Sequence, residues 1–94
     1  MTEQNLKAYQ PRRYQRRNEE LDVLICVKGQ CGTVTTYDVS EGGLGLNLST
    51  ARDLPELKVG SIVSTRPVDS PHSSAIVARV VRIEGDNMGI EFVT

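Results

Sequence analysis

Arginines are concentrated in one short segment near the N-terminus, at positions 12, 13, 16 and 17. The guanidinium fork matches two oxygens of a phosphate or the O6 and N7 atoms of guanine, and its plane can stack on a purine. Arg12 and Arg16 are four residues apart, as are Arg13 and Arg17, so either pair can grip two points of one ligand. Both pairs are therefore candidates for binding an anionic ligand.

A second group of polar residues follows at positions 38–43, between two strand-like runs, with the sequence Asp-Val-Ser-Glu-Gly-Gly. Side chains alternate faces along a strand, so Asp38 and Ser40 share one face, whereas Val39 shares the other face with Tyr37. If Val39 lies in the core, Asp38 and Ser40 point outward. There Asp38 can accept hydrogen bonds from the N1–H and N2–H groups of guanine, and Ser40 can bond a phosphate oxygen or a base edge.

Two glycines complete this segment. Gly42 and Gly43 lie where a turn requires positive φ or where a ligand approaches the backbone closely. The arginines, the carboxylate, the hydroxyl and the glycines together predict a site for an anionic purine nucleotide, and more narrowly for a cyclic dinucleotide. Further along the chain, we interpret Arg79 and Arg82 as outward strand positions that could also extend a phosphate-binding surface.

Charge is unevenly distributed along the chain, although the formal net charge is only −1. The first twenty residues hold five of the eleven basic residues and three of the twelve acidic residues, and the remainder is acidic. A protein that binds nucleic acid over much of its surface is usually broadly basic. A basic arm on an acidic body suits a small multivalent anion better, so no nucleic acid partner is expected.

The 94 residues are expected to form one small domain with an arm in front of it. Residues 1–20 are polar, carry the arginines and show almost no apolar periodicity, which predicts a flexible basic arm. Residues 21–94 contain short runs rich in Val, Ile and Thr between turn residues, which is typical of antiparallel strands. Strands are expected at residues 21–28, 33–39, 44–48, 61–66, 74–84 and 88–93. Six short strands without a long helix favour a small barrel or sandwich.

Of the two cysteines, Cys26 precedes a predicted turn at residues 29–32 and Cys31 lies within it. A disulfide between them requires that the two strands pair in register. The chain shows no signal-like apolar N-terminus and no stretch long enough to span a membrane, so we expect a cytoplasmic protein with reduced thiols. A zinc site is not expected, because the single histidine, His72, has no second cluster of ligands near it.

Several of these motifs together resemble the PilZ domain family, whose members are bacterial receptors for cyclic di-GMP. The resemblance rests first on an arginine pair with three residues between its members, and on the pattern Asp-x-Ser-x-x-Gly formed by Asp38, Ser40 and Gly43. It continues through residues 42–46 (Gly-Gly-Leu-Gly-Leu), 57–63 (Leu-Lys-Val-Gly-Ser-Ile-Val) and 89–93 (Gly-Ile-Glu-Phe-Val). It therefore covers nearly the whole chain from about residue 12 onward.

The resemblance implies an all-β fold, a small six-stranded antiparallel barrel with an N-terminal arm. It also implies that the arginines close over one or two molecules of cyclic di-GMP beside Asp38, Ser40 and Gly43, with cyclic di-GMP as a ligand rather than a cofactor. Binding would change the conformation of the arm and regulate an unidentified protein partner in motility, in exopolysaccharide and biofilm formation or in virulence. The chain would act as a monomer or a homodimer.

Other classes of function remain alternatives to this interpretation. A small barrel that binds RNA or single-stranded nucleic acid typically stacks bases on several exposed aromatic side chains, and this chain has only three tyrosines and one phenylalanine. A protein-interaction module that works without a ligand is a further alternative. An enzyme such as a phosphodiesterase needs a metal cluster or a general base aimed at a nucleophile. One histidine and scattered carboxylates predict no catalytic residues and no metal site.

Overall fold

The computed structural model describes residues 20–70 and 72–93, so all but the last residue of the predicted arm lies outside the described residues. The regular structure within these ranges is entirely β-strand. The six strands are β2 (Asp22–Val27), β3 (Gln30–Val39), β4 (Gly43–Arg52), β5 (Ile62–Pro67), β6 (Ile76–Glu84) and β7 (Asn87–Phe92). Each strand overlaps one of the six runs predicted from the sequence.

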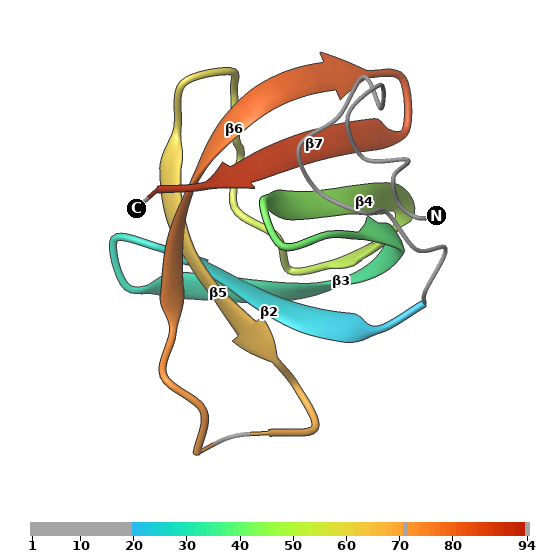
Figure 1. Ribbon diagram of the computed structural model, residues 1–94. Helices are drawn as coiled ribbons and strands as arrows, with labels where there is room; N and C mark the ends of the chain where they lie inside the picture. The colour runs from blue at the N-terminus through green and yellow to red at the C-terminus, as the bar shows by residue number, and fades with distance from the viewer. Residues whose placement is uncertain (1–19, 71, 94) are drawn as a thin grey trace, which may run out of the picture.

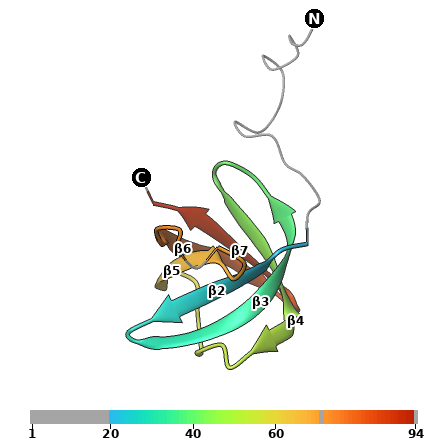
Figure 2. The same ribbon diagram turned by 90° about the horizontal axis from the view of Figure 1, so that it is seen from below.

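The strands close into a barrel in the order β2-β3-β4-β7-β6-β5. Every neighbouring pair is antiparallel, and β2 completes the barrel by pairing with β5, with Leu24 opposite Arg66. Figures 1 and 2 show the strands curving around a single central space. The predicted all-β, six-stranded antiparallel barrel is therefore confirmed, and its closure leaves no strand edge unpaired.

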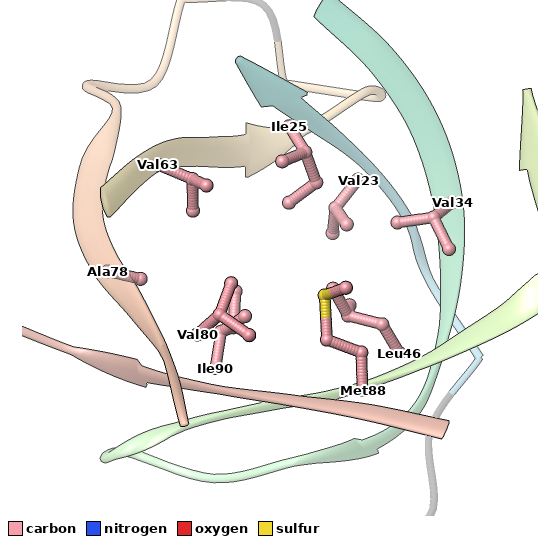
Figure 3. Packing of buried hydrophobic residues seen from close by; sticks show 9 residues of the cluster. All are labelled: Val23, Ile25, Val34, Leu46, Val63, Ala78, Val80, Met88 and Ile90. Atoms are coloured by element: carbon pink, nitrogen blue, oxygen red, sulfur yellow. The ribbon is translucent and has the colours of Figure 1, made fainter. Parts of the chain in front are cut away.

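Nine buried apolar side chains fill this central space, and every strand contributes at least one of them (Figure 3). The period-two alternation of a strand selects them. On β6, for example, Ala78 and Val80 are fully buried, whereas Val77 and Arg79 between and beside them are exposed. The nine residues are Val23, Ile25, Val34, Leu46, Val63, Ala78, Val80, Met88 and Ile90. This core holds the six strands in one register and so fixes the loops at both ends of the barrel.

Tight turns connect the consecutive hairpins. Lys28 and Gly29 join β2 to β3 with φ values of 51° and 83°, and positive φ at both central residues is the geometry of a type I′ turn. The turn lies one residue earlier than predicted and is shorter, because β3 already begins at Gln30. Gly85, with φ of 59°, begins the predicted turn between β6 and β7. Strand β4 is longer than predicted and continues to Arg52.

Cys26 and Cys31 face each other across the β2–β3 hairpin, with their Cα atoms 4.1 Å apart, and form a disulfide. The prediction of reduced thiols is therefore wrong. The tight turn provides the register that a disulfide requires, because it makes these two residues a non-hydrogen-bonded pair, in which side chains of antiparallel strands come closest. The disulfide closes the hairpin at the end of β3 that is remote from Asp38.

Candidate functional site

The β3–β4 hairpin carries the part of the predicted site that the structure describes. Asp38 lies near the end of β3, Ser40 and Gly42 lie in the turn, and Gly43 begins β4. The predicted arginines at positions 12, 13, 16 and 17 lie outside the described residues. What the structure brings together is therefore the carboxylate, the hydroxyl and the two glycines.

A β-bulge in β3 determines where Asp38 points. Thr36 pairs with Leu46 and Asp38 pairs with Gly45, so Tyr37 is an additional residue on β3. Thr36 and Leu46 are 1% and 0% exposed and face the barrel interior. Gly45 precedes Leu46 on β4 and therefore lies on the opposite, outer face. Asp38 is paired with Gly45 and shares this outer face.

Asp38 is only 9% exposed although it lies on the outer face. An ionised carboxylate offers acceptor positions alone, and its two oxygens match a group with two adjacent N–H donors. The Watson–Crick edge of guanine and the guanidinium of arginine are groups of this kind. In a partly desolvated setting such hydrogen bonds are stronger than in water. The position is suited to selective recognition of one donor pair.

The side chain of Ser40 is engaged with its own turn. Its hydroxyl accepts hydrogen bonds from the N–H groups of Gly42 (3.1 Å) and Gly43 (3.2 Å) and donates to the carbonyl of Gly43 (3.3 Å). The N–H of Ser40 donates to the same carbonyl at 3.0 Å. Both acceptor positions of the hydroxyl and its proton are thus used. Ser40 holds the turn in shape, and a ligand oxygen would have to replace the Gly43 carbonyl as the partner of its proton.

Gly43 is required by the approach of a neighbouring strand. A Cβ atom at this position would collide with the carbonyl oxygen of Ile90 on β7. The turn is tied to the same strand by the N–H of Phe92, which donates to the carbonyl of Gly42 at 2.8 Å. Positive φ occurs at other glycines and not at Gly42 or Gly43, so that part of the sequence-based explanation is wrong. The missing side chain at Gly43 lets the hairpin lie flat against β7.

Tyr37 is placed differently from the prediction. The sequence put it on the same face as Val39, but the bulge moves its ring over Gly45, where a Cβ atom would lie 2.7 Å from the ring carbon Cζ. A simple alternation of faces fails here because the bulge inserts one residue. The signal that could have revealed this contact is Gly45 itself, since a glycine inside a strand often marks the close approach of another group.

Arg82 on β6 reaches the same region from the other side. Its guanidinium Nη2 donates to the Tyr37 hydroxyl at 3.4 Å, and its Nη1 lies 3.5 Å from the Glu84 carboxylate. The hydrogen bond to Tyr37 is the largest influence on the pKa of Arg82 and raises it above its ordinary value; burial opposes this shift, and the charge of Glu84 adds to it. Arg82 therefore remains a cation at any working pH. Sequence reasoning placed Arg82 correctly as an outward residue but did not connect it with Tyr37 or Asp38.

Other features of the described residues lie away from the turn that joins β3 and β4. A cleft of about 620 Å³ opens where the register of β3 and β4 shifts, beside Asp22, Thr35 and Arg52. Thr35 donates a hydrogen bond to Asp22 there at 2.9 Å. Within residues 20–70 and 72–93, no three His, Cys, Asp or Glu side chains are arranged to hold a metal ion. Nor does this part of the chain contain a helix long and apolar enough to cross a membrane.

Comparisons with known proteins agree with the barrel fold. The family model of the PilZ domain matches residues 10–94, a range that includes the four arginines and the β3–β4 hairpin. No curated protein gives a significant match.

Two solved structures resemble the described barrel. One is the Bacillus subtilis inhibitor of motility (MotI/DgrA), with a TM-score of 0.70 and 22% sequence identity over 90% of this chain. The chain spans only 44% of that protein. The other is the PilZ domain of CeSA from a cellulose-synthesizing bacterium, with a TM-score of 0.66 and 20% identity over 85% of this chain and 81% of that domain. At these identities the structural likeness establishes the fold alone.

Proposed function

The chain belongs to the PilZ domain family, and from this premise we propose that it binds cyclic di-GMP and acts as a non-enzymatic effector that regulates a protein partner. One observation carries the proposal most directly. The family match spans both the arginine segment and the hairpin, and in the hairpin Asp38 lies on the outer face of the barrel beside a turn held by Ser40.

Recognition would divide between the two segments. Asp38 would accept the N1–H and N2–H donors of one guanine, which adenine does not offer in the same arrangement. The arginines at positions 12, 13, 16 and 17 would grip the phosphates and the O6/N7 edge of guanine bidentately. The ligand would lie across the turn of the hairpin, which is kept close to β7 by Gly42, Gly43 and the hydroxyl of Ser40.

Binding would act as a switch if it changes the relative populations of the conformations of the arm. A ligand shifts a conformational equilibrium only when it binds one state more tightly than the other. Contacts that span the arm and the barrel exist only when both are brought together, so cyclic di-GMP would favour the closed state. The surface made of arm and ligand would then engage or release the partner.

The regulated partner would act in motility or in exopolysaccharide production. One structural neighbour is an inhibitor of motility and the other is the PilZ domain of CeSA from a cellulose-synthesizing bacterium, which makes motility and exopolysaccharide production the processes to test first. We propose a cytoplasmic site of action, where a bacterial second messenger would be available. The Cys26–Cys31 disulfide is the feature against this location, because disulfides persist mainly in oxidising compartments.

Isothermal titration calorimetry of the full chain with cyclic di-GMP, GMP, GTP and cyclic di-AMP tests the proposal. We expect binding of cyclic di-GMP at micromolar concentrations, with much weaker binding of the other three. Asp38→Ala should weaken this binding. Arg12→Ala and Arg16→Ala should each weaken it as well, and comparison with Arg13→Ala and Arg17→Ala identifies which of the two arginine pairs grips the ligand. Arg66→Ala on β5 is the matched control. Wild-type protein that ignores cyclic di-GMP would refute the proposal.

A further inference from the structure

A row of four residues crosses four neighbouring strands on the outer face of the barrel. Tyr37 on β3 lies over Gly45 on β4, and Gly45 pairs with Gly89 on β7. Gly89 in turn pairs with Arg82 on β6, whose guanidinium lies over it, with Nη2 2.9 Å from where a Cβ atom would be. The hydroxyl of Tyr37 and the guanidinium of Arg82 meet at 3.4 Å above the glycine pair.

The two glycines make this arrangement possible. Any side chain at Gly45 would push the ring of Tyr37 away, and any side chain at Gly89 would displace the guanidinium of Arg82. Because neither position carries a side chain, the ring of Tyr37 and the guanidinium of Arg82 can pack directly on the backbone of the sheet, next to each other. Tyr37 is half-buried and the side chain of Arg82 is 37% exposed, so each contacts the sheet on one side and leaves part of its surface open.

This row of residues lies next to Asp38 on the outer face of the barrel. Tyr37 and Asp38 are consecutive residues of one bulge and both lie opposite Gly45. A ligand held at Asp38 is therefore in contact range of the ring of Tyr37 and of the guanidinium beyond it. Aromatic rings and guanidinium planes are the two protein surfaces on which a purine stacks most favourably.

We infer that Tyr37 and Arg82 form a stacking platform for a purine base of the dinucleotide bound at Asp38. This inference rests on the proposed function and names two further residues of the same site. Asp38 selects the base by its edge, whereas the platform supports a base by its face, and a cyclic dinucleotide offers two bases for these two tasks. The positive charge of Arg82 also attracts the phosphates of the ligand. The hydroxyl of Tyr37 accepts a hydrogen bond from the guanidinium of Arg82 and so fixes the orientation of the guanidinium plane.

Three substitutions test the platform by calorimetric titration with cyclic di-GMP. Arg82→Lys keeps the charge and removes the plane. Gly89→Ala keeps Arg82 and moves its guanidinium off the sheet. Arg66→Lys, on β5 and paired with Leu24 of β2, is the matched control. We expect the first two to weaken binding by about tenfold each, the size of a lost stacking contact, and the control to bind as the wild type does.

A second measurement reports on the location of the base. Amide signals of Gly45 and Gly89 in a ¹H–¹⁵N NMR spectrum should shift on ligand addition, because a purine stacked over Tyr37 and Arg82 lies above both. The dispersion of the same spectra shows whether each variant is folded. Wild-type binding that is lost in Asp38→Ala but unchanged in Arg82→Lys and Gly89→Ala would overturn the platform and leave the proposed function standing. Absence of wild-type binding would overturn both.

Discussion

The α-carbon of Gly43 packs against the carbonyl oxygen of Ile90 so closely that only a hydrogen atom fits between them. This contact joins the start of β4 to the end of β7 and sets the position of the turn that follows Asp38. The carbonyl belongs to a paired strand of a closed barrel, so it has little freedom to move away. Gly43 is therefore required for the packing of the barrel, whether or not a ligand binds.

Gly43→Ala should accordingly destabilise the barrel and displace the β3–β4 hairpin. We expect the free energy of unfolding in urea to fall by about 1–3 kcal/mol, the usual cost of inserting an atom into a well-packed region. Glu41→Ala is the control, because Glu41 lies in the same turn with its side chain exposed. Equal stability of the two variants would contradict the steric explanation.

Ser40→Ala removes the acceptor shared by the N–H groups of Gly42 and Gly43. Because the turn is part-buried, these donors would be only partly compensated by water, and we expect a loss of about 1–2 kcal/mol in the free energy of unfolding. Hydrogen exchange of the two glycine amides should become faster. Ser49→Ala, which removes an exposed hydroxyl bonded to Asn47, should leave both stability and exchange nearly unchanged.

Cyclic di-GMP binding separates the structural role of Ser40 from direct contact with the ligand. If Ser40 acts only by holding the turn, conditions that stabilise the fold, such as lower temperature, should restore most of the affinity of Ser40→Ala. If its hydroxyl also contacts the ligand, the loss of affinity should persist when the variant is fully folded. Calorimetric titrations at two temperatures distinguish these results.

The strands and their order of appearance could be predicted from the sequence because short runs rich in Val, Ile and Thr stand between turn residues. Val23 and Ile25 lie in one such run, Ala78 and Val80 lie in another, and all four are buried. The Asp38 and Ser40 motif was visible for a different reason, since its residue types and spacing are themselves the signal. Neither inference needed to know which strands become neighbours.

The features that sequence reasoning missed depend on how the strands pair with one another. Tyr37 lies on the outer face because β4 pairs with β3 through a bulge, and nothing in β3 alone requires that bulge. The need for glycine at position 43 comes from Ile90 on β7, and the contact of Tyr37 with Arg82 comes from β6. The disulfide likewise required the register of the β2–β3 hairpin, which the longer predicted turn had obscured.

The Tyr37–Arg82 hydrogen bond should contribute equally to stability at mildly acidic and mildly alkaline pH. Because this contact raises the folded-state pKa of Arg82, its stabilisation is complete below the unfolded pKa and is lost only as the pH rises through the folded pKa. Both values lie far above neutrality. Tyr37→Phe should therefore lower the free energy of unfolding by the same small amount at pH 5.5 and pH 8.5, about 0.5–1 kcal/mol given the solvent exposure of Arg82.

Urea denaturation of the wild type, Tyr37→Phe, Arg82→Gln and the double variant at both pH values measures this contribution as a double-mutant cycle. Arg79→Gln is the control for loss of a cation from the same strand. A coupling energy that changed between the two pH values would show that a group other than Arg82 titrates in the contact.

The Cys26–Cys31 disulfide should stabilise the barrel without affecting the ligand site. It closes a short loop, for which the chain-entropy model gives about 2 kcal/mol, and Cys31 is separated from Asp38 by most of the length of β3, roughly 23 Å of extended strand. Addition of dithiothreitol should therefore lower the melting temperature of the wild type, whereas the affinity for cyclic di-GMP should stay the same as long as the protein is folded.

The double variant Cys26→Ser/Cys31→Ser provides the comparison for this prediction. It should melt close to the reduced wild type and should not respond to dithiothreitol, because it has no disulfide to lose. Equal melting temperatures of oxidised and reduced wild type would contradict a stabilising role. A reductant-dependent change in affinity for cyclic di-GMP, absent from the double variant, would instead show that the β2–β3 hairpin and the β3–β4 hairpin are coupled through β3, the one strand that they share.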